Sequence, residues 1–185
     1  MKKPAKKSVE RTRKFTLIKP LGQNGEIKEV IVKPLTAAQA HELKFPLASQ
    51  ATIEDEEALV ILSTGLDAVT LQTITKMDFN TLFTAAYEYL TMTSYELAGD
   101  TMDVKSKVLT LYFQDDEQEL TFDYPTLQVS KVAAKKKDDV ERAIFIISQI
   151  TDLDEQDIKE MAFPDYLSAV EMTTAFLTLP ADYFQ

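Results

Sequence analysis

The sequence predicts an α+β protein built from two tandem copies of one module, a β-hairpin followed by three or four helices. First, the segment "DFNTLFTAAYEYLT" at 78–91 has the same outline as "DYLSAVEMTTAFLT" at 165–178. Second, two short runs of alternating apolar and polar residues lie upstream of each segment, and this period is typical of strands. Third, the period changes to a helical one after each pair of runs.

The expected hairpins are rich in β-branched and aromatic residues. In the first, "FTLIK" and "IKEVIV" flank the turn "PLGQNGE", where Gly22 and Gly25 allow positive φ. In the second, "KVLTLYF" and "ELTFDY" flank "QDDEQ". A proline follows each hairpin, and an offset of 91 pairs Pro34 with Pro125.

The first two helices of each module have recognisable N-terminal signals. Thr36 with Gln39 forms a capping-box pattern that opens a helix around "TAAQAHELK", and Thr126 stands in the matching place. A second helix is expected over about Glu54 to Ser63, matched by the helical spacing of apolar residues in "KDDVERAIFIISQI".

The last two helices of each module align without a gap at an offset of 87. Asp67 and Asp154 are expected to cap short helices over "AVTLQTIT" and "EQDIKEMA", and Asp78 and Asp165 to cap the closing helices. The aligned apolar positions keep their character: Leu71 with Ile158, Ile74 with Met161, Phe79 with Tyr166, and Tyr89 with Phe176.

These patterns predict a domain order. Residues 1–14 form a flexible basic tail, 15–95 the first module, 96–105 ("ELAGDTMDVK") a linker, 106–179 a second, diverged module and 180–185 a C-terminal tail. Pro180 should end the closing helix, which leaves an apolar tail beyond the repeat. Phe45, Tyr95 and Leu179 also fall outside the core-facing spacings.

Composition and charge narrow the function classes. With 45% hydrophobic and 27% charged residues, the chain of 185 residues is typical of a globular protein. It has no apolar run of the roughly 18 residues that a membrane span needs, and the segment "MKKPAKKSVERTRK" has no apolar stretch behind its charges, so we expect a cytoplasmic protein. Residues 1–14 carry a charge of +6 and the remainder −16. The acidic body repels nucleic-acid phosphate, whereas the short basic tail could touch an acidic partner or RNA, or remain solvated. We expect neither nucleic acid nor a membrane as a partner.

Catalytic and metal-binding patterns are missing from the sequence, which has no cysteine and a single histidine, His41. The acidic run "TDLDEQD" at 151–157 has Asp157 where a calcium loop that starts at Asp152 needs glycine. We interpret it as a helix cap, and the run "DDEQE" at 115–119 as an exposed turn. We therefore expect no enzyme, no metal and no cofactor.

The order of hairpin, proline and "STGLDAVTLQTITKMDFNTLFTAAYEYL" resembles the phage tail assembly chaperone family of contractile-tailed, Mu-like phages. The resemblance covers residues 15–91 and lies in the hairpin that ends at Pro34, "TGL" at 64–66, the spaced Leu71 and Ile74, and Asp78 before the closing helix. Residues 107–178 look like a diverged second copy, with "ITDL" for "STGL" and Pro164 inserted before Asp165.

The resemblance implies a non-catalytic protein of the host cytoplasm that keeps the tape-measure protein soluble until tail-tube subunits polymerise around it. Such a protein would be absent from the mature particle. The expected partner is the tape-measure protein, and tail-tube subunits and a second copy of the chain are left open as further partners.

Binding of a partner's amphipathic helix in a groove between helices is the expected mode. The predicted partner-binding residues are apolar and lie near the ends of the two closing helices or beyond them: Tyr87, Leu90, Phe176, Leu177, Tyr183 and Phe184. The alternative is that several of them fill the core of their own module, above all Leu90 and Leu177.

Two other function classes remain open on the sequence. The acidic body suits a decoy that mimics DNA, which would require two rows of carboxylates at phosphate-like spacing. A structural tail component that stays in the particle is the other, and mass spectrometry of purified particles would detect it.

Overall fold

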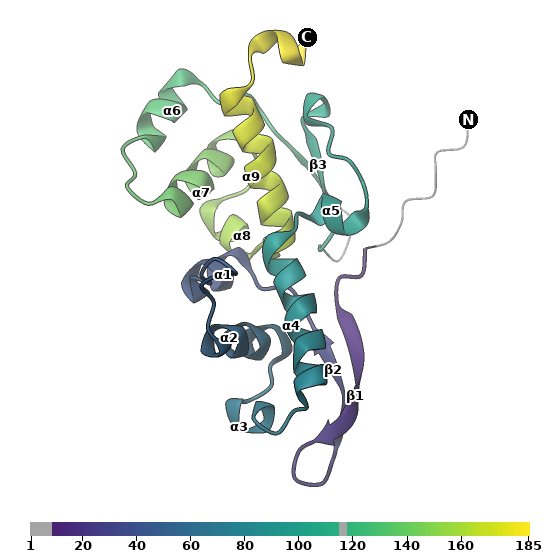
Figure 1. The fold of residues 1–185 in the computed structure, drawn as a ribbon. Helices are drawn as coiled ribbons and strands as arrows, with labels where there is room; N and C mark the ends of the chain where they lie inside the picture. Colours follow the sequence, from purple (N-terminus) through teal and green to yellow (C-terminus); the bar gives the residue numbers. More distant parts are fainter. Residues whose placement is uncertain (1–8, 115–117) are drawn as a thin grey trace, which may run out of the picture. The chain divides into compact units, whose positions relative to one another are not determined.

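The computed structural model describes residues 9–114 and 118–185 (Figure 1). Residues 1–8 of the predicted basic tail and Asp115, Asp116 and Glu117 of the predicted acidic turn lie outside the described residues. The chain divides into an N-terminal unit that spans Glu10–Thr91 and a C-terminal unit that spans Met92–Gln185.

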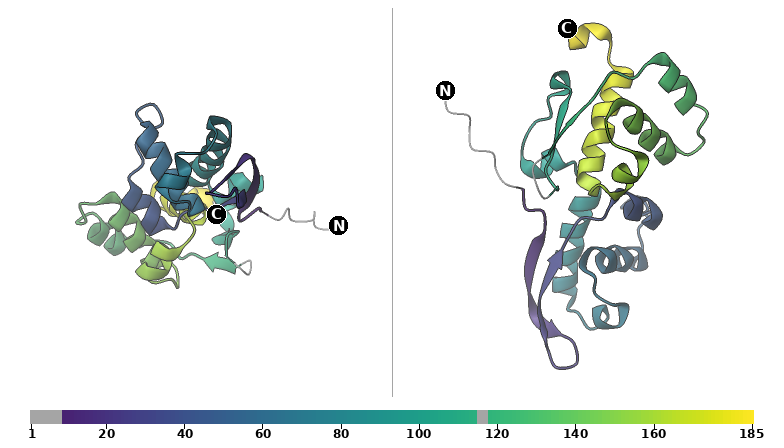
Figure 2. Two further views of the ribbon diagram at one scale, coloured as in Figure 1. Left: turned by 90° about the horizontal axis from the view of Figure 1, so that it is seen from below. Right: turned by 180° about the vertical axis from the view of Figure 1, so that it is seen from behind.

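The N-terminal unit begins with a hairpin of strands β1 (Arg13–Leu21) and β2 (Ile27–Val32), which pair antiparallel with Phe15 opposite Val30. Helices α1 (Ala37–Leu43), α2 (Ile53–Thr64), α3 (Ala68–Leu71) and α4 (Lys76–Thr91) follow. Helix α4 runs along the hairpin, as two opposite views show (Figures 1 and 2). The buried face of α4, which includes Phe79, Leu82 and Tyr89, closes the core of this unit.

The C-terminal unit opens with helix α5 (Ser94–Ala98) and the 3₁₀ turn η1 (Val104–Ser106). The antiparallel hairpin of β3 (Val108–Leu111) and β4 (Gln118–Thr121) comes next. Helices α6 (Leu127–Ala133), α7 (Asp139–Ile150), α8 (Glu155–Glu160) and α9 (Phe163–Thr178) follow, and the 3₁₀ turn η2 (Ala181–Phe184) ends the chain. Fully buried Phe122, Ile147, Ile158 and Met172 make the centre of the core.

The α+β prediction is confirmed, because the described residues hold two antiparallel hairpins and are mainly helical elsewhere. Both units have the order hairpin and then four helices, and α4 and α9 have 16 residues each with starts and ends 87 positions apart. Among the described residues, no helix combines the length and the apolar character required to cross a bilayer.

The same hydrogen bonds recur in the two units. The N–H after the second strand donates to the end of the second helix in both, from Lys33 to the Ser63 carbonyl at 3.0 Å and from Asp123 to the Ile150 carbonyl at 2.7 Å. The Oγ1 atoms of Thr64 and Thr151 likewise bond the carbonyl four residues earlier, at 2.7 and 2.8 Å. Helices α2 and α7 therefore end in the same way, each bonded to the segment that follows the second strand of its own unit.

Side-chain caps start the helices at several predicted positions. Thr36 caps α1 in a full capping box with Gln39, and Thr126 caps α6. Asp67 caps α3, and Asp154 caps α8 by accepting the N–H groups of Gln156 and Asp157. Thr36 and Thr126 lie 90 positions apart, so Pro34 corresponds to Tyr124 and not, as we expected, to Pro125.

The predicted capping role of Asp78 and Asp165 is wrong. Both residues lie inside the first turn of their helices, and α9 has no side-chain cap at all. The Oγ1 of Thr75 receives the Asp78 N–H at 3.1 Å instead. Both carboxylates are buried, and they accept backbone N–H groups from the hairpin of their own unit. Local spacing in the sequence does not reveal this long-range role.

The division between the units falls at Thr91, whereas we placed a linker at 96–105. Part of that segment belongs to α5 and to η1, and α5 ends at Gly99 with a φ of 62°. These elements are too short to give a periodic pattern, which explains why the segment looked irregular. Tyr95, expected outside the core, is buried within the C-terminal unit.

Candidate partner-binding site

Five aromatic side chains gather at the C-terminal end of α9, and we call them the C-terminal aromatic cluster: Phe122, Tyr124, Phe176, Tyr183 and Phe184. The ring of Phe176 is the centre, with centroids 6.2 Å from Phe122, 5.3 Å from Tyr124 and 5.5 Å from Phe184. Tyr183 joins through Phe184 at 5.1 Å. Most of these pairs meet edge to face, the arrangement that aromatic quadrupoles favour.

The local sequence explains how the cluster forms. Helix α9 ends at Thr178 because Leu179 turns to extended backbone, with φ −83° and ψ 144°, and Pro180 cannot continue the helix. The Tyr183 N–H then bonds the Pro180 carbonyl at 3.1 Å, which closes η2 and directs Phe184 back toward Phe176 and Tyr124. Tyr124 belongs to the segment between β4 and α6, and its ring packs against those of Phe176 and Phe184.

An open pocket of about 380 Å³ lies on this cluster. Its walls are mostly apolar: Tyr124, Pro125, Phe176, Leu179, Ala181, Phe184 and Gln185. The volume is at the lower end of the range for ligand pockets, about 300–1,000 Å³. It suits one or two apolar side chains of a partner.

Two lysines lie over rings of the cluster. Lys105 Nζ is 5.1 Å from the ring centroid of Tyr183, and Lys107 Nζ is 4.9 Å from that of Tyr124. Both distances are within the range of cation–π attraction. On a chain with a net charge of −10, these cations favour an acidic group beside the apolar anchor of a ligand.

The structure brings together three of the six predicted partner-binding residues. Phe176, Tyr183 and Phe184 belong to the cluster, although Phe176 is buried and serves mainly as its base. Leu177 lies on α9 with 42% of its surface exposed, but it does not line the pocket. Tyr124, 48% exposed, was missed, and its signal is an aromatic residue placed between a strand and a proline.

Tyr87 and Leu90 belong to the N-terminal unit and are half-buried on α4. The Tyr87 ring packs against Phe83 at 5.6 Å and Phe45 at 5.8 Å, and Phe83 stacks on Phe79 at 6.4 Å. This row packs along the side of α4, and of its four rings only Phe79 is buried, whereas the other three are half-buried. Leu90 does not line the pocket on the C-terminal aromatic cluster.

Titratable groups in the interior serve the fold. Burial raises the pKa of Tyr89 to about 12, and the Tyr89 hydroxyl donates to the Glu10 carbonyl at 2.9 Å. Burial also raises the pKa of Tyr166 to about 12, with a smaller contribution from the charge of Asp138. At the exposed cap of α3, hydrogen bonds from the Thr70 hydroxyl and N–H lower the pKa of Asp67.

No cluster of three or more His, Asp or Glu side chains with metal-binding geometry occurs in the part of the chain that the structure describes. Comparison of the chain with protein-family models, with curated proteins and with solved structures found no match.

Proposed function

We propose that this protein is a non-catalytic phage tail assembly chaperone that binds the tape-measure protein and keeps it soluble in the host cytoplasm while the tail tube forms. The observation that carries the proposal is the open aromatic pocket between Tyr124, Phe176 and Phe184. Its size and apolar walls fit a large apolar side chain of a partner. Long helical partners present such side chains along the apolar face of an amphipathic helix.

Binding would proceed by helix-in-groove docking. A large apolar side chain of the partner enters the pocket, and neighbouring apolar residues of its helix cover Leu179 and Tyr183, which are 37% and 43% exposed. Each Å² of apolar surface removed from water contributes about 25 cal/mol before ordering costs. Lys105 and Lys107 would pair with an acidic residue beside the anchor, and the acidic remainder of the chain keeps the complex dissolved.

We also propose that the two units arose by tandem duplication. The shared order of elements, the equal lengths of α4 and α9 and the recurring hydrogen bonds support this. The N-terminal unit has Pro34 at the position of Tyr124. It also has no equivalent of η2, because its closing helix α4 ends at Thr91 and the C-terminal unit follows, whereas α9 ends at Thr178 and η2 follows. The aromatic pocket is therefore a specialisation of the second copy.

Co-expression with the tape-measure protein tests the function. The fraction of tape-measure protein in the soluble lysate should rise several-fold with the intact chain, and should fall back when the chain ends at Leu179 or carries Phe184→Ser. Val69→Ser, at an exposed apolar position of the N-terminal unit, is the matched control and should behave as the intact chain does. Equal insolubility of the partner with and without this chain would refute the proposal.

Two other outcomes would point elsewhere. Recovery of a nucleic-acid-binding protein alone in a pull-down would favour the DNA-mimic alternative. Stoichiometric amounts of the chain in purified particles would make it a structural tail component.

A further inference from the structure

In the C-terminal unit, helix α5 packs against α9 and β3. The Ser94 N–H donates to Ser168 Oγ at 3.1 Å, and the two serine hydroxyls lie 2.9 Å apart. The Tyr95 hydroxyl accepts the Thr110 N–H at 2.9 Å, and the Tyr95 ring meets Tyr112 edge to face at 5.2 Å. Ser94 and Tyr95 are buried by these contacts.

Equivalent hydrogen bonds locate the surface of the N-terminal unit that corresponds to the α5-binding surface of the C-terminal unit. Asp78 binds the Ile18 N–H as Asp165 binds the Tyr112 N–H, which aligns "RKFTLI" at 13–18 with "KVLTLY" at 107–112. Thr16 then corresponds to Thr110. The offset of 87 between α4 and α9 places Thr81 where Ser168 lies.

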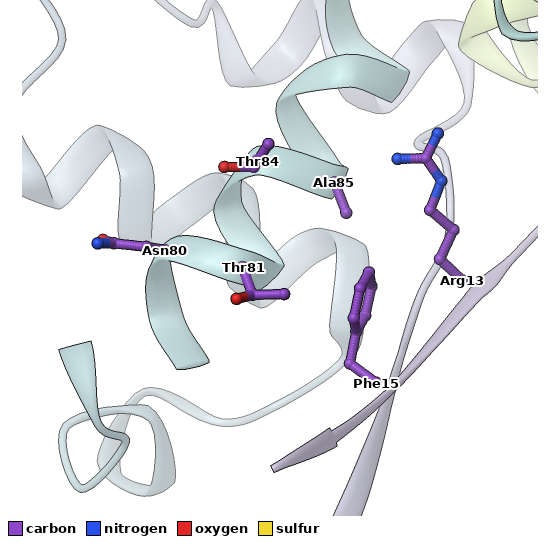
Figure 3. Close-up of a pocket in the computed structure, with 6 residues that line it drawn as sticks. All are labelled: Arg13, Phe15, Asn80, Thr81, Thr84 and Ala85. Atoms are coloured by element: carbon purple, nitrogen blue, oxygen red, sulfur yellow. The ribbon is translucent and has the colours of Figure 1, made fainter. Parts of the chain in front are cut away.

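An open groove is found at that place. Its volume is about 360 Å³, and its lining residues come from β1 and α4: Arg13, Phe15, Asn80, Thr81, Thr84 and Ala85 (Figure 3). Thr81 and Ala85 lie on the side of α4 that faces Phe15. Thr81 and Thr84 are exposed, whereas Ser168, the counterpart of Thr81 in the C-terminal unit, is buried beneath α5.

We propose that this groove, the β1–α4 groove, is a docking site for a short Ser- or Thr-capped helix of a partner protein with the chemistry of α5. A small residue of that helix lies against Thr81, and an aromatic hydroxyl that follows it reaches the N–H of Thr16 on the outer edge of β1. The chain itself supplies the template for this ligand, "TSYELAG" at 93–99.

Charge selects among such helices. Of the six lining residues one is charged, Arg13, which also binds Glu88 and lies 5.0 Å from the ring of Tyr89. A cation at this end of the groove favours an acidic group on the bound helix; in α5 itself, the Glu96 carboxylate accepts the Thr93 N–H at 2.7 Å and completes the cap of its own helix. The groove shares no residue with the C-terminal aromatic cluster, so the inference stands apart from the proposed function.

Nuclear magnetic resonance of the ¹⁵N-labelled full chain tests the site, with a synthetic peptide of residues 90–100 as the probe. We expect saturable amide shifts at Thr16, Thr81, Thr84 and Ala85, with a Kd of about 1 mM or tighter. A peptide of the same composition in scrambled order should give none.

Paired variants make the test specific. Thr81→Arg should weaken binding at least tenfold, and Thr84→Arg serves as a second variant should the first fail to fold. Thr91→Arg is the matched control, because Thr91 is also exposed on α4 and makes the same bond to the carbonyl four residues earlier, at 2.8 Å against 3.1 Å for Thr81. Shifts confined to Thr110 and Ser168, shifts that Thr81→Arg leaves unchanged, or no saturable shift would each overturn the inference.

Discussion

Both carboxylate oxygens of Asp78 accept the backbone N–H of Ile18, at 3.0 and 3.2 Å, and so join the first turn of α4 to β1 across 60 positions of sequence. Asp165 makes the equivalent connection with the N–H groups of Tyr112 and Phe113, at 3.0 and 2.9 Å. A charged acceptor makes these bonds stronger than ordinary backbone bonds. One buried carboxylate thus fixes the closing helix to the hairpin in each unit.

Removal of this connection should destabilise the protein strongly. Asp78→Ala is expected to lower the free energy of unfolding by about 2–4 kcal/mol, because it leaves the Ile18 N–H without its acceptor and deprives the Thr75 hydroxyl of its partner at 2.8 Å. Urea denaturation followed by circular dichroism measures the change. Asp152→Ala, at an exposed aspartate, is the control and should cost less than about 0.5 kcal/mol; equal costs for the two would contradict the assignment.

The C-terminal aromatic cluster should separate stability from binding. Phe176→Ala is expected to cost about 3–5 kcal/mol, because Phe176 is buried between Phe122 and Tyr124. Tyr183→Ala should cost less than about 1 kcal/mol, because 43% of the residue's surface is exposed. Thermal unfolding of the two variants measures this, and a similar loss for both would show that η2 belongs to the core and is not a free surface.

The cap of α1 offers a smaller effect with a conservative control. Thr36→Ala removes the acceptor for the Gln39 N–H, 3.2 Å away, and should cost about 1 kcal/mol. Thr36→Ser keeps the hydroxyl and should stay within a few tenths of the parent value. Should Ser and Ala prove equally costly in urea denaturation, the side-chain bond would not be what starts this helix.

Alkaline pH should destabilise the chain through Tyr89 and Tyr166. Their pKa is raised to about 12 in the fold and is about 10 in unfolded chains, so the folded state holds protons that the unfolded state releases. The free energy of unfolding is therefore unaffected by these groups below pH 10 and falls as pH rises from 10 to 12. Tyr166→Phe should reduce that slope, measured by urea denaturation at several pH values; an unchanged slope would exclude Tyr166 as a cause.

Much of the fold follows from local sequence. The capping box at Thr36 and the N-caps Asp67 and Asp154 depend on contacts within three residues, so the sequence pattern is sufficient to predict them. The helix predicted over 54–63 is observed as Ile53–Thr64, and its cap, Thr52 with Asp55, is a contact of the same short range. The offset of 87 also predicted the exact correspondence of α4 and α9.

The remaining features depend on contacts between distant residues. Local spacing predicts that Asp78 and Asp165 are helix caps, whereas their partners are N–H groups of a distant hairpin. Likewise Tyr95 is outside the core-facing spacings, and it is buried because α5 packs on β3 and α9. Half of the predicted binding residues meet in one cluster, because Phe176, Tyr183 and Phe184 are close in sequence. Tyr124 is 52 positions before Phe176, and its approach requires the packing of the whole unit.

Strand β1 lies at an edge of its two-stranded sheet, and the Ile18 side chain on it is 67% exposed. Such an edge is a template for pairing with other chains, which leads to aggregation. The register of β1 shifts between Thr16 and Leu21, and Lys19 and Pro20 lie within that irregular stretch. A bulge, a lysine and a proline each oppose strand-to-strand association. Beyond Thr16 the hairpin is thus protected against self-polymerisation.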